Sequence, residues 1–395
     1  MEQAMTTPKE RITVNCIGAG RWGPNVVRAF THLPDVRVKL VCDRDEGRLD
    51  LVRNRIPGIE TTTDLEQALD DSEADAVAIA TPVDTHFELA RRAITAGKHV
   101  LVEKPLCKSV TQCEELIAGA RMRHSVLAVG HVFLFNPGIQ KVREYIASGE
   151  LGRIFYIHAT RTNLGPVRTD VNALWDLASH DLSIFGYWLG QSPVSVSVTG
   201  QRYISRNVDD VVTASFSYPD GVTAFAYASW LNPRKVREIT VVGERKMVVW
   251  NDMDLTEPVR IYDRSIALDE ELQYSDSFAS FQATVREGDV VIPRVAGGES
   301  LVAQCAHFVE CIRTGATPVN NARMALSVVR TLTAADVSLA HHGHAVPVDR
   351  EVLRGRDALS DEIVWSQATA ERLVNRLKDT SHERNERVAV GRIGH

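Results

Sequence analysis

The sequence ITVNCIGAGRWG, residues 12–23, decides the fold of the N-terminal part of the chain. Its first half is a short apolar run rich in β-branched residues, which is typical of a buried strand. The run stops at Gly18, and a helical pattern follows. A second apolar run, 36–42, then leads to Asp43. Strand, glycine turn, helix and strand in this order predict one βαβ unit.

The turn after the first strand has the pattern G-x-G-x-x-G, which is typical of dinucleotide-binding sites. Gly18 permits a sharp exit from the strand, Gly20 lets the backbone approach a pyrophosphate, and Gly23 lets the helix pack close to the sheet. The helix N-terminus offers free N–H groups and the positive end of its dipole to phosphates. The residues expected to contact the cofactor here are Gly18, Gly20, Arg21, Trp22, Gly23, Asp43 and Arg44.

The residue after the second strand indicates which nicotinamide dinucleotide is bound. Asp43 follows Gly23 by about 20 residues, the spacing of an acid that accepts hydrogen bonds from the adenosine ribose. A carboxylate there would repel a 2′-phosphate, so NAD is expected in preference to NADP. The adjacent Arg44 could soften this preference or could be a solvated surface charge.

Strands and helices continue to alternate after this unit, which predicts a parallel, doubly wound α/β sheet. Strand-like runs occupy 75–81, 99–103 and 126–133, with helical patterns over 85–96 and 111–123. Ligands of such sheets bind at the carboxyl ends of the strands. Residues at these ends extend the expected cofactor site: Thr81, Pro82, His86, Glu103, Lys104 and His131. Each also has a simpler explanation, such as a proline that ends a strand.

The second half of the chain has a different order of predicted strands and helices. A strand over 154–161 leads through a loop to a helix near 173–189, and several strand-like runs then follow without helices between them. Consecutive strands predict a largely antiparallel sheet, hence an α+β domain. The expected organisation is a flexible N-terminus over 1–10, a Rossmann domain over 11–135, a substrate-binding and oligomerisation domain over 136–348, and a charged helical, partly disordered tail over 349–395.

Composition narrows the possible partners. The 395-residue chain has a net charge of −6, so neither nucleic acid nor an anionic membrane is expected as a partner. The longest apolar runs are strand-length, and residues 1–11 do not form a signal peptide. None of the six cysteines forms a C-x-x-C pair, so we expect a cytoplasmic protein with reduced thiols and no metal site. The tract HHGH over 341–344 has no carboxylate or cysteine at ligand spacing.

A second cluster of chemically active residues lies in the segment WDLASHD, residues 175–181. On a helix Asp176 and His180 are four residues apart and share a face, so the carboxylate could orient the imidazole. The alternative is an ordinary ion pair on a helix surface. The spacing leaves both interpretations open.

Three motifs together resemble the glucose–fructose oxidoreductase, inositol dehydrogenase and rhizopine catabolism family, Gfo/Idh/MocA. They are the glycine turn, the string AGKHVLVEKP over 96–105, and Asp176-x-x-x-His180. The resemblance covers about residues 10–345 and implies an N-terminal Rossmann domain and a C-terminal domain with an open, mainly antiparallel sheet. Members often form dimers or tetramers through that sheet, so a homo-oligomer is expected.

The resemblance also implies roles in hydride transfer between a nicotinamide and a secondary hydroxyl or ketone. Lys104 would contact the reacting hydroxyl and steady the developing alkoxide, although a desolvated lysine could take the proton itself. His180 would be the general base, and Asp176 would orient or tune it. The Lys-Pro peptide of this motif is often cis in the family, which would aim the lysine inward.

The segment RTNLG over 161–165 and the approach to Asp176 resemble family members from nucleotide-sugar pathways. The implied substrate is position 3 of a UDP- or dTDP-linked sugar, with inositol or a free sugar as the alternative. A non-catalytic NAD-binding sensor is a third possibility, against which the retained Lys104 and His180 argue. Arginines suit phosphate groups, although each could instead be structural. The residues implied in substrate binding are Lys104, Arg161, Asn163, Arg168, Asn172, Trp175, Asp176, His180 and Arg237.

Overall fold

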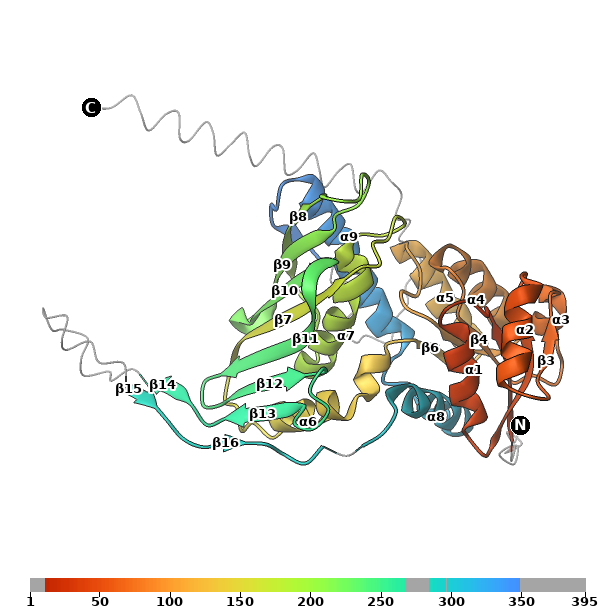
Figure 1. The fold of residues 1–395 in the computed structure, drawn as a ribbon, viewed down its shortest axis with the longest axis horizontal. Coiled ribbons are helices and arrows are strands. Elements are labelled where there is room, and N and C mark those ends of the chain that lie inside the picture. Colours follow the sequence, from red (N-terminus) through yellow and green to blue (C-terminus); the bar gives the residue numbers. More distant parts are fainter. Residues whose placement is uncertain (1–10, 268–283, 296, 349–395) are drawn as a thin grey trace, which may run out of the picture. The chain divides into compact units, whose positions relative to one another are not determined.

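The computed structural model describes residues 11–267, 284–295 and 297–348 (Figure 1). The expected N-terminal segment 1–10 and the expected tail 349–395 lie outside these ranges. The described part contains a six-stranded sheet, a nine-stranded sheet and a two-stranded ribbon of β14 (Ser265–Ala267) with β15 (Thr284–Arg286). Within these ranges no helix is long and apolar enough to cross a membrane.

The six-stranded sheet is parallel throughout, with the order β3-β2-β1-β4-β5-β6. This order confirms the doubly wound α/β sheet expected from the sequence. All residues of β1 and β4 are buried, as in a parallel sheet with both faces covered. Its elements are β1 (Ile12–Ile17), α1 (Gly23–Thr31), β2 (Val36–Cys42), α2 (Glu46–Arg55), β3 (Glu60–Thr62), α3 (Leu65–Leu69), β4 (Ala76–Ile79), α4 (His86–Thr95), β5 (His99–Val102), α5 (Val110–Met122) and β6 (Leu127–Val129).

The glycine turn after β1 has the steric requirements that its sequence predicts. Gly18 has a φ of +102°, and a Cβ atom there would lie 2.6 Å from the carbonyl oxygen of Ala80. A Cβ atom on Gly23 would lie 1.9 Å from the carbonyl oxygen of Gly18, so only glycine lets α1 approach the turn. Gly20 differs, because the nearest atom to its Cβ position is the tip of Arg48 at 3.6 Å. Packing within the described chain therefore leaves room at Gly20.

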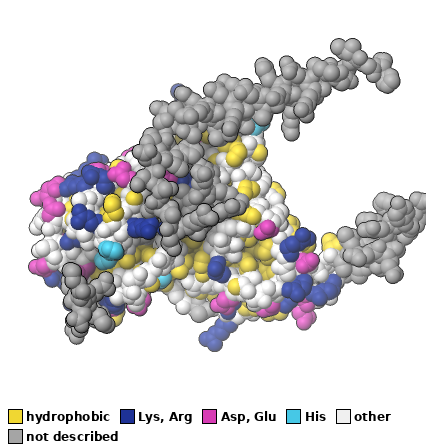
Figure 2. All heavy atoms as spheres, turned by 180° about the vertical axis from the view of Figure 1, so that it is seen from behind, with side chains coloured by type: hydrophobic (Ala, Val, Ile, Leu, Met, Phe, Trp, Pro, Cys, Tyr) yellow, Lys and Arg dark blue, Asp and Glu magenta, His cyan; other side chains and the backbone are white. Residues whose placement is uncertain are grey.

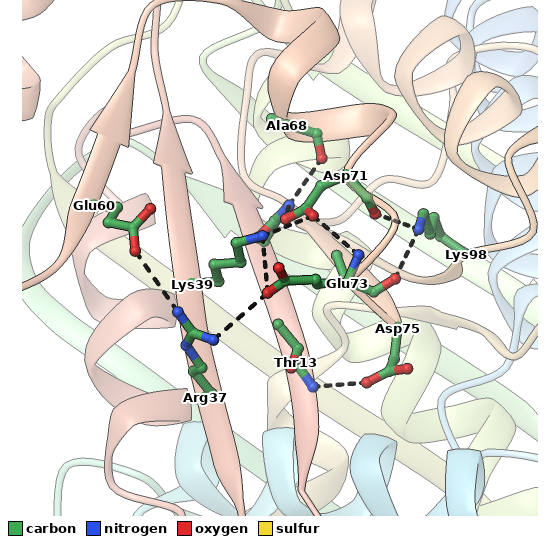
Figure 3. Close-up of polar contacts among 11 residues, drawn as sticks. Thr13, Arg37, Lys39, Glu60, Ala68, Asp71, Glu73, Asp75 and Lys98 are labelled. Carbon is green, nitrogen blue, oxygen red and sulfur yellow. Dashed lines mark hydrogen bonds and ion pairs between the residues drawn. The ribbon is translucent and has the colours of Figure 1, made fainter. Parts of the chain in front are cut away.

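The turn between α3 and β4 is held by polar contacts that we call the polar clamp (Figure 3). The Asp71 carboxylate accepts hydrogen bonds from Asn15 Nδ2 at 3.0 Å and from Lys39 Nζ at 2.8 Å. The buried Lys98 donates from Nζ to the carbonyl oxygens of Asp71 at 2.6 Å and Ala74 at 2.7 Å. The clamp lies near the amino ends of β4 and β5, away from the carboxyl edge of the sheet.

The nine-stranded sheet has the order β16-β13-β12-β11-β7-β10-β9-β8-β17. Neighbours are antiparallel except β7 and β10, which confirms the expected α+β architecture of the second domain. Its strands are β7 (Ile154–Leu164), β8 (Ser195–Gln201), β9 (Val211–Ser217), β10 (Thr223–Ser229), β11 (Leu231–Gly243), β12 (Met247–Asn251), β13 (Val259–Tyr262), β16 (Val290–Val291) and β17 (Val346–Pro347). The α-helices in the described part of this half are α6 (Pro137–Ala147), α7 (Ser179–Leu189), α8 (Ser300–Thr314) and α9 (Ala322–Ala340).

One face of the nine-stranded sheet packs on helices and the other is open. Along β7, Ile157 and Ala159 are buried, whereas Tyr156 and His158, which alternate with them, are exposed. Tyr156 packs edge-to-face on Phe225 of β10, with ring centroids 6.3 Å apart. Figure 2 shows hydrophobic side chains gathered over this second domain, on the right of that view. The open face therefore carries apolar as well as polar surface.

The chain returns to the first domain through α8. Phe308 of α8 packs edge-to-face on Phe30 of α1, with ring centroids 6.4 Å apart, and Glu299 pairs with Arg28. Residues of α8 belong to the same buried core as β1. The expected division, with all of 136–348 in one substrate domain, misses this return. Helical periodicity reveals an apolar face but not the sheet that covers it.

Candidate active site

The carboxyl ends of the parallel strands gather the predicted residues of the first domain at one edge. The glycine turn follows β1, and Glu103 follows β5. Pairing of Val102 with Val129 in β5 and β6 brings Lys104 level with His131, each two positions beyond its paired residue. These side chains therefore share the edge where ligands of such sheets bind.

Asp43 closes the glycine turn. Its buried carboxylate accepts hydrogen bonds from the backbone N–H of Ala19 at 2.7 Å and of Asp45 at 3.0 Å. Arg48 Nη1 lies 3.9 Å from the same carboxylate, and Arg44 is exposed. These two backbone N–H groups thus occupy much of the hydrogen-bonding capacity of the carboxylate that was predicted to bind ribose.

His86 lies beneath the edge rather than facing it. Its buried Nδ1 is 2.9 Å from the carbonyl oxygen of Pro105, and its Nε2 is 2.9 Å from that of Thr81. Burial lowers the pKa of His86 below its usual value. The Thr81 hydroxyl bonds with that of Thr85 at 2.7 Å, and Pro82 is exposed. His86 therefore holds together the loops after β4 and β5, and its effect on a cofactor would act through them.

Trp22 connects the glycine turn to the end of β5. Its Nε1 donates to Oε1 of Glu103 at 2.8 Å, and the Lys104 backbone N–H donates to Oε2 at 3.3 Å. A Cβ atom on Gly130 would lie 2.6 Å from that Oε2, so the glycine makes room for the carboxylate. Burial raises the pKa of Glu103 to about 7, although the Trp22 hydrogen bond opposes the rise. The neighbouring Arg21 is exposed.

Lys104 reaches from the first domain to the second. Its Nζ donates to the carbonyl oxygen of Asp176 at 2.8 Å and lies 3.9 Å from the Asp176 carboxylate. The Lys104–Pro105 peptide is cis, as the resemblance implied. Burial lowers the pKa of Lys104 below its usual value, and the guanidinium groups of Arg168 and Arg161 add to this effect.

Asp176 and His180 belong to one helix, which begins with a π-helical turn over Leu174–Ala178 and continues as α7. The Asp176 carboxylate accepts hydrogen bonds from Arg168 Nη1 and from Trp230 Nε1, both at 3.1 Å. In the described part of the chain, no hydrogen bond joins the Asp176 and His180 side chains. The role of Asp176 in orienting or tuning the imidazole therefore stays a prediction. A π-helical turn departs from α-helical spacing, and a guanidinium offers the carboxylate a stronger bond.

His180 lies among cations and an aromatic ring. Phe133 contacts it edge-to-face, with ring centroids 4.9 Å apart. Its buried Nδ1 has no hydrogen-bond partner among the described residues. Burial, reinforced by Lys104 and Arg161, lowers the pKa of His180 well below its usual value. The imidazole is therefore neutral near pH 7, the form that can accept a proton.

His131 is the second buried imidazole of the site, with 1% of its surface exposed. Neither ring nitrogen has a hydrogen-bond partner within the described ranges. Burial, reinforced by Lys104, lowers the pKa of His131 to about 3. A buried polar group without a partner is costly, so these nitrogens fit a site that a bound molecule completes.

The predicted substrate-binding arginines already have carboxylate partners. Arg161 makes a buried bidentate pair with Asp181, with Nε 3.1 Å from both carboxylate oxygens and Nη2 2.6 Å from one. Arg237, whose side chain is 36% exposed, pairs with Asp252 at 3.0 Å. Both guanidinium groups lie over the Phe133 ring, at 4.6 and 5.7 Å from its centroid. Arg161 therefore shapes the site from within a closed ion pair.

The remaining predicted substrate residues lie in or near the loop after β7. Arg168 has a side chain that is 41% exposed and bonds from Nε to Asp170 at 2.9 Å. Asn163 donates to the carbonyl oxygen of Gly165. The loop is thus fixed by its own side chains, with Arg168 at its exposed side.

Asn172 and Trp175 turn toward α9 instead of the sheet edge. Asn172 Nδ2 and Trp175 Nε1 donate to the two carboxylate oxygens of Asp336, at 3.1 and 2.8 Å. Burial raises the pKa of Asp336, although these two donors oppose the rise. Contact between the two donors and substrate stays a prediction.

Sequence reasoning missed several residues that shape the site. Each was hidden because its partner is distant in sequence or because it lay inside an apolar run. Only the adjacency of Asp181 to His180 could have drawn attention to one of them. They are Phe133, Asp181, Trp230, Asp252 and Asp336. In the ranges that the structure describes, no group of three His, Cys, Asp or Glu side chains could hold a metal ion.

Comparison with known proteins matches both domains to one family. Residues 12–131 match its oxidoreductase model with an NAD-binding Rossmann fold, and residues 139–249 match the Gfo/Idh/MocA C-terminal domain. The chain is 35% identical over 182 residues to UDP-N-acetylglucosamine 3-dehydrogenase of Acidithiobacillus ferrooxidans. It is 31% identical over 195 residues to inositol 2-dehydrogenase 2 of Saccharopolyspora erythraea. These matches cover 46 and 48% of this chain and span 54 and 58% of the relatives' lengths.

The fold is also found in solved structures. GenD2 from gentamicin A biosynthesis, in complex with NAD, is 26% identical, with a TM-score of 0.72 over 89% of this chain and 100% of its own. This match covers both domains, and so do the two family models taken together. The hydrogen bond from Lys104 to the Asp176 carbonyl oxygen joins the two domains. The chain belongs to the Gfo/Idh/MocA family of oxidoreductases with an NAD-binding Rossmann fold.

Proposed function

We propose that this protein moves a hydride between NAD and a secondary hydroxyl or ketone of a sugar, with C3 of a UDP- or dTDP-linked sugar as the reacting position. The observation that carries the proposal is the approach of Lys104 and His180 from different domains. Lys104 Nζ is held at 2.8 Å by the carbonyl oxygen of Asp176, one helical turn before His180. Two basic groups thus meet beside the edge where a nicotinamide would lie.

The residues at the sheet edge fit a dinucleotide. Gly20 leaves room at the turn, and α1 directs its N-terminus there. His131 lies level with Lys104 at this edge. Neither of its ring nitrogens has a hydrogen-bond partner among the described residues. Bound NAD would supply a hydride acceptor at C4 of its nicotinamide. Its adenosine ribose would lie toward Asp43.

His180 is suited to take the proton of the hydroxyl while the hydride leaves the carbon that bears this hydroxyl. Its low pKa keeps the imidazole neutral and ready to accept a proton. Lys104 would donate a hydrogen bond to the oxygen and oppose the charge that develops on it. The Asp176 carboxylate would hold Arg168 and Trp230 beside Lys104 and His180. Its carbonyl oxygen would accept the hydrogen bond from Lys104 Nζ.

Similarity to a UDP-N-acetylglucosamine 3-dehydrogenase supports a nucleotide-linked sugar. The partly exposed guanidinium groups of Arg168 and Arg237 could share a diphosphate with their present carboxylate partners. The test is to incubate the full chain with NAD and UDP-sugars, dTDP-sugars, free sugars and inositols, and to follow the reduced cofactor. We expect turnover on a nucleotide-linked sugar; turnover on a free polyol alone would overturn this substrate class.

An inositol or free-sugar dehydrogenase is the second candidate. Inositol 2-dehydrogenase 2 is also a relative, and the three arginines near the site each already pair with a carboxylate. In that case Arg168→Gln and Arg237→Gln would leave the KM for the sugar nearly unchanged. For a nucleotide-linked substrate, each would raise KM about tenfold or more.

NAD, rather than NADP, is the proposed cofactor because Asp43 stands where the adenosine ribose would lie. Asp43→Ala should weaken NAD binding and narrow its preference over NADP. Equal weakening of both dinucleotides would instead reduce Asp43 to a support for the glycine turn, through its bond to Ala19.

We also propose that the open face of the nine-stranded sheet joins copies of the chain into a homo-oligomer. Sedimentation of the protein should give a dimer or tetramer. Tyr156→Lys, on the exposed face beside Phe225, should shift it toward monomer.

A further inference from the structure

The side chain of Trp22 bridges two strands that are not neighbours. Trp22 follows β1 and Glu103 follows β5, while β4 lies between these strands. The 2.8 Å hydrogen bond from Trp22 Nε1 to Glu103 therefore crosses the carboxyl end of β4. Trp22 is 42% exposed at this edge. A molecule that extends from the glycine turn toward Lys104 must pass over this side chain.

Glu103 carries the connection onward to Lys104. One carboxylate oxygen accepts the Trp22 N–H, and the other accepts the backbone N–H of Lys104 at 3.3 Å. The carboxylate lies over Gly130, where a Cβ atom would be only 2.6 Å from Oε2, so the absence of a side chain at residue 130 gives the carboxylate its place. The backbone N–H of Glu103 is bound to the carbonyl oxygen of Ile79 at 2.9 Å. The backbone of Glu103 is thus anchored at the end of β4, and its carboxylate is held by the Trp22 and Lys104 N–H groups.

Lys104 completes a continuous path to the second domain. Its Nζ donates to the carbonyl oxygen of Asp176, on the helix that carries His180. The path runs Trp22, Glu103, Lys104, Asp176, and each step is a hydrogen bond. Its first member belongs to the dinucleotide turn and its third is the lysine assigned to the reacting oxygen.

We propose that Trp22 and Glu103 are positioning residues that couple a dinucleotide bound at the glycine turn to the placement of Lys104. The dinucleotide packs on the exposed indole and restricts it. The indole then holds the Glu103 carboxylate, which holds the backbone of Lys104. The consequence for catalysis rests on the proposed function, whereas the mechanical link does not.

Two variants break the link with little change in shape. Trp22→Phe removes the N–H donor and keeps an aromatic ring, and Glu103→Gln replaces one acceptor oxygen with a donor. Trp188→Phe is the matched control, because its Nε1 also makes one hydrogen bond, to the carbonyl oxygen of Ile139 at 2.9 Å away from the site. Circular dichroism and thermal melting check that each variant is folded.

The first measurement needs no substrate. Reductive methylation of the full chain, followed by mass spectrometry, gives the labelling rate of Lys104 relative to that of Lys108, with and without NAD. We expect Trp22→Phe and Glu103→Gln to raise the relative rate by up to about tenfold, because a Lys104 backbone without its restraint weakens the remaining bond from Nζ to the Asp176 carbonyl oxygen. NAD should protect Lys104 in the wild type and in Trp188→Phe, but much less in the two link variants. Unchanged labelling and protection in both link variants would overturn the proposal.

The second measurement uses turnover. For Trp22→Phe we expect kcat to fall about tenfold while the Kd of NAD changes less than about threefold. A raised Kd with an unchanged kcat would make Trp22 a simple binding residue and would also overturn the proposal. If the wild type oxidises no sugar but the labelling pattern holds, the proposed function fails and the link stands.

Discussion

Lys104 and His180 approach the same space from different domains, and burial makes each of them less basic than usual. The lysine has a defined partner in the Asp176 carbonyl oxygen, whereas His180 Nδ1 has none among the described residues. This difference suits Lys104 as a hydrogen-bond donor that stays in place and His180 as a base that receives a proton. The division of work between them, which the sequence left open, can be tested by substitution.

Lys104→Ala and His180→Ala should each lower kcat by about 10²–10⁴-fold, the usual contribution of acid–base groups, with the Kd of NAD nearly intact. Initial rates and calorimetric titration with NAD measure the two effects. Lys108→Ala is the control, since Lys108 pairs with Asp84 on the surface. Lost NAD affinity with preserved chemistry would show that these roles are misassigned.

His131 should make the fold sensitive to acid. Burial and Lys104 lower its pKa from 6.5 to about 3, so below pH 6.5 the unfolded chain binds a proton that the folded chain does not. Stability is therefore retained above pH 6.5 and lost as the pH falls toward 3, by about 1.4 kcal/mol per pH unit. Between pH 7 and 5, His131→Phe should lose about 2 kcal/mol less than the wild type in urea unfolding. Equal losses would contradict this, and the exposed His158→Gln should behave as wild type.

At the scale of elements, the polar clamp fixes the turn before β4 with hydrogen bonds beside the buried Ala74 (Figure 3). Lys98→Met would leave the carbonyl oxygen of Ala74 without this donor, while the carbonyl oxygen of Asp71 keeps the backbone N–H of Ala74 at 3.2 Å. We expect a loss of about 1–3 kcal/mol in the free energy of unfolding, because one acceptor is then unsatisfied and the other loses one of its two donors. Urea denaturation measures it. Lys141→Met, which breaks the surface pair with Glu144, should cost less than about 1 kcal/mol, and a similar cost for both variants would contradict the clamp's role.

Element prediction succeeded where the apolar pattern was strong. The runs that became β1 and β4 were recognised because every residue faces a covered sheet. The pattern did not reveal α2, since its sequence EGRLDLVRNR is mostly polar and buries only Leu49 and Val52. The periodicity also did not reveal Asn136 as the residue that begins α6, where its side chain accepts from the N–H groups of Gly138 and Ile139. Polar helices and caps depend on neighbours that a periodicity does not register.

At the scale of the whole molecule, α8 makes the first domain depend on a segment far along the chain. Phe308 is fully buried against Phe30, so Phe308→Ala should cost about 3–5 kcal/mol. The loss should appear as weaker NAD binding at intermediate urea, because it loosens the core beside α1. Met122→Ala, at an exposed position, is the control. Unfolding of the second sheet alone, with NAD binding retained, would contradict the placement of α8.

The sequence by itself determined the parallel sheet, the glycine turn and the edge at which Glu103, Lys104 and His131 stand. These follow from short-range rules: strand periodicity, the sterics of glycine, and the common direction of parallel strands. Only the tertiary structure decided that Arg161 is closed in a pair with Asp181 and that the Asp176 carboxylate bonds to Arg168 and Trp230. It also decided that α8 joins the first core. Such pairings depend on which side chains packing brings together across the sheets, and no spacing along the chain encodes that.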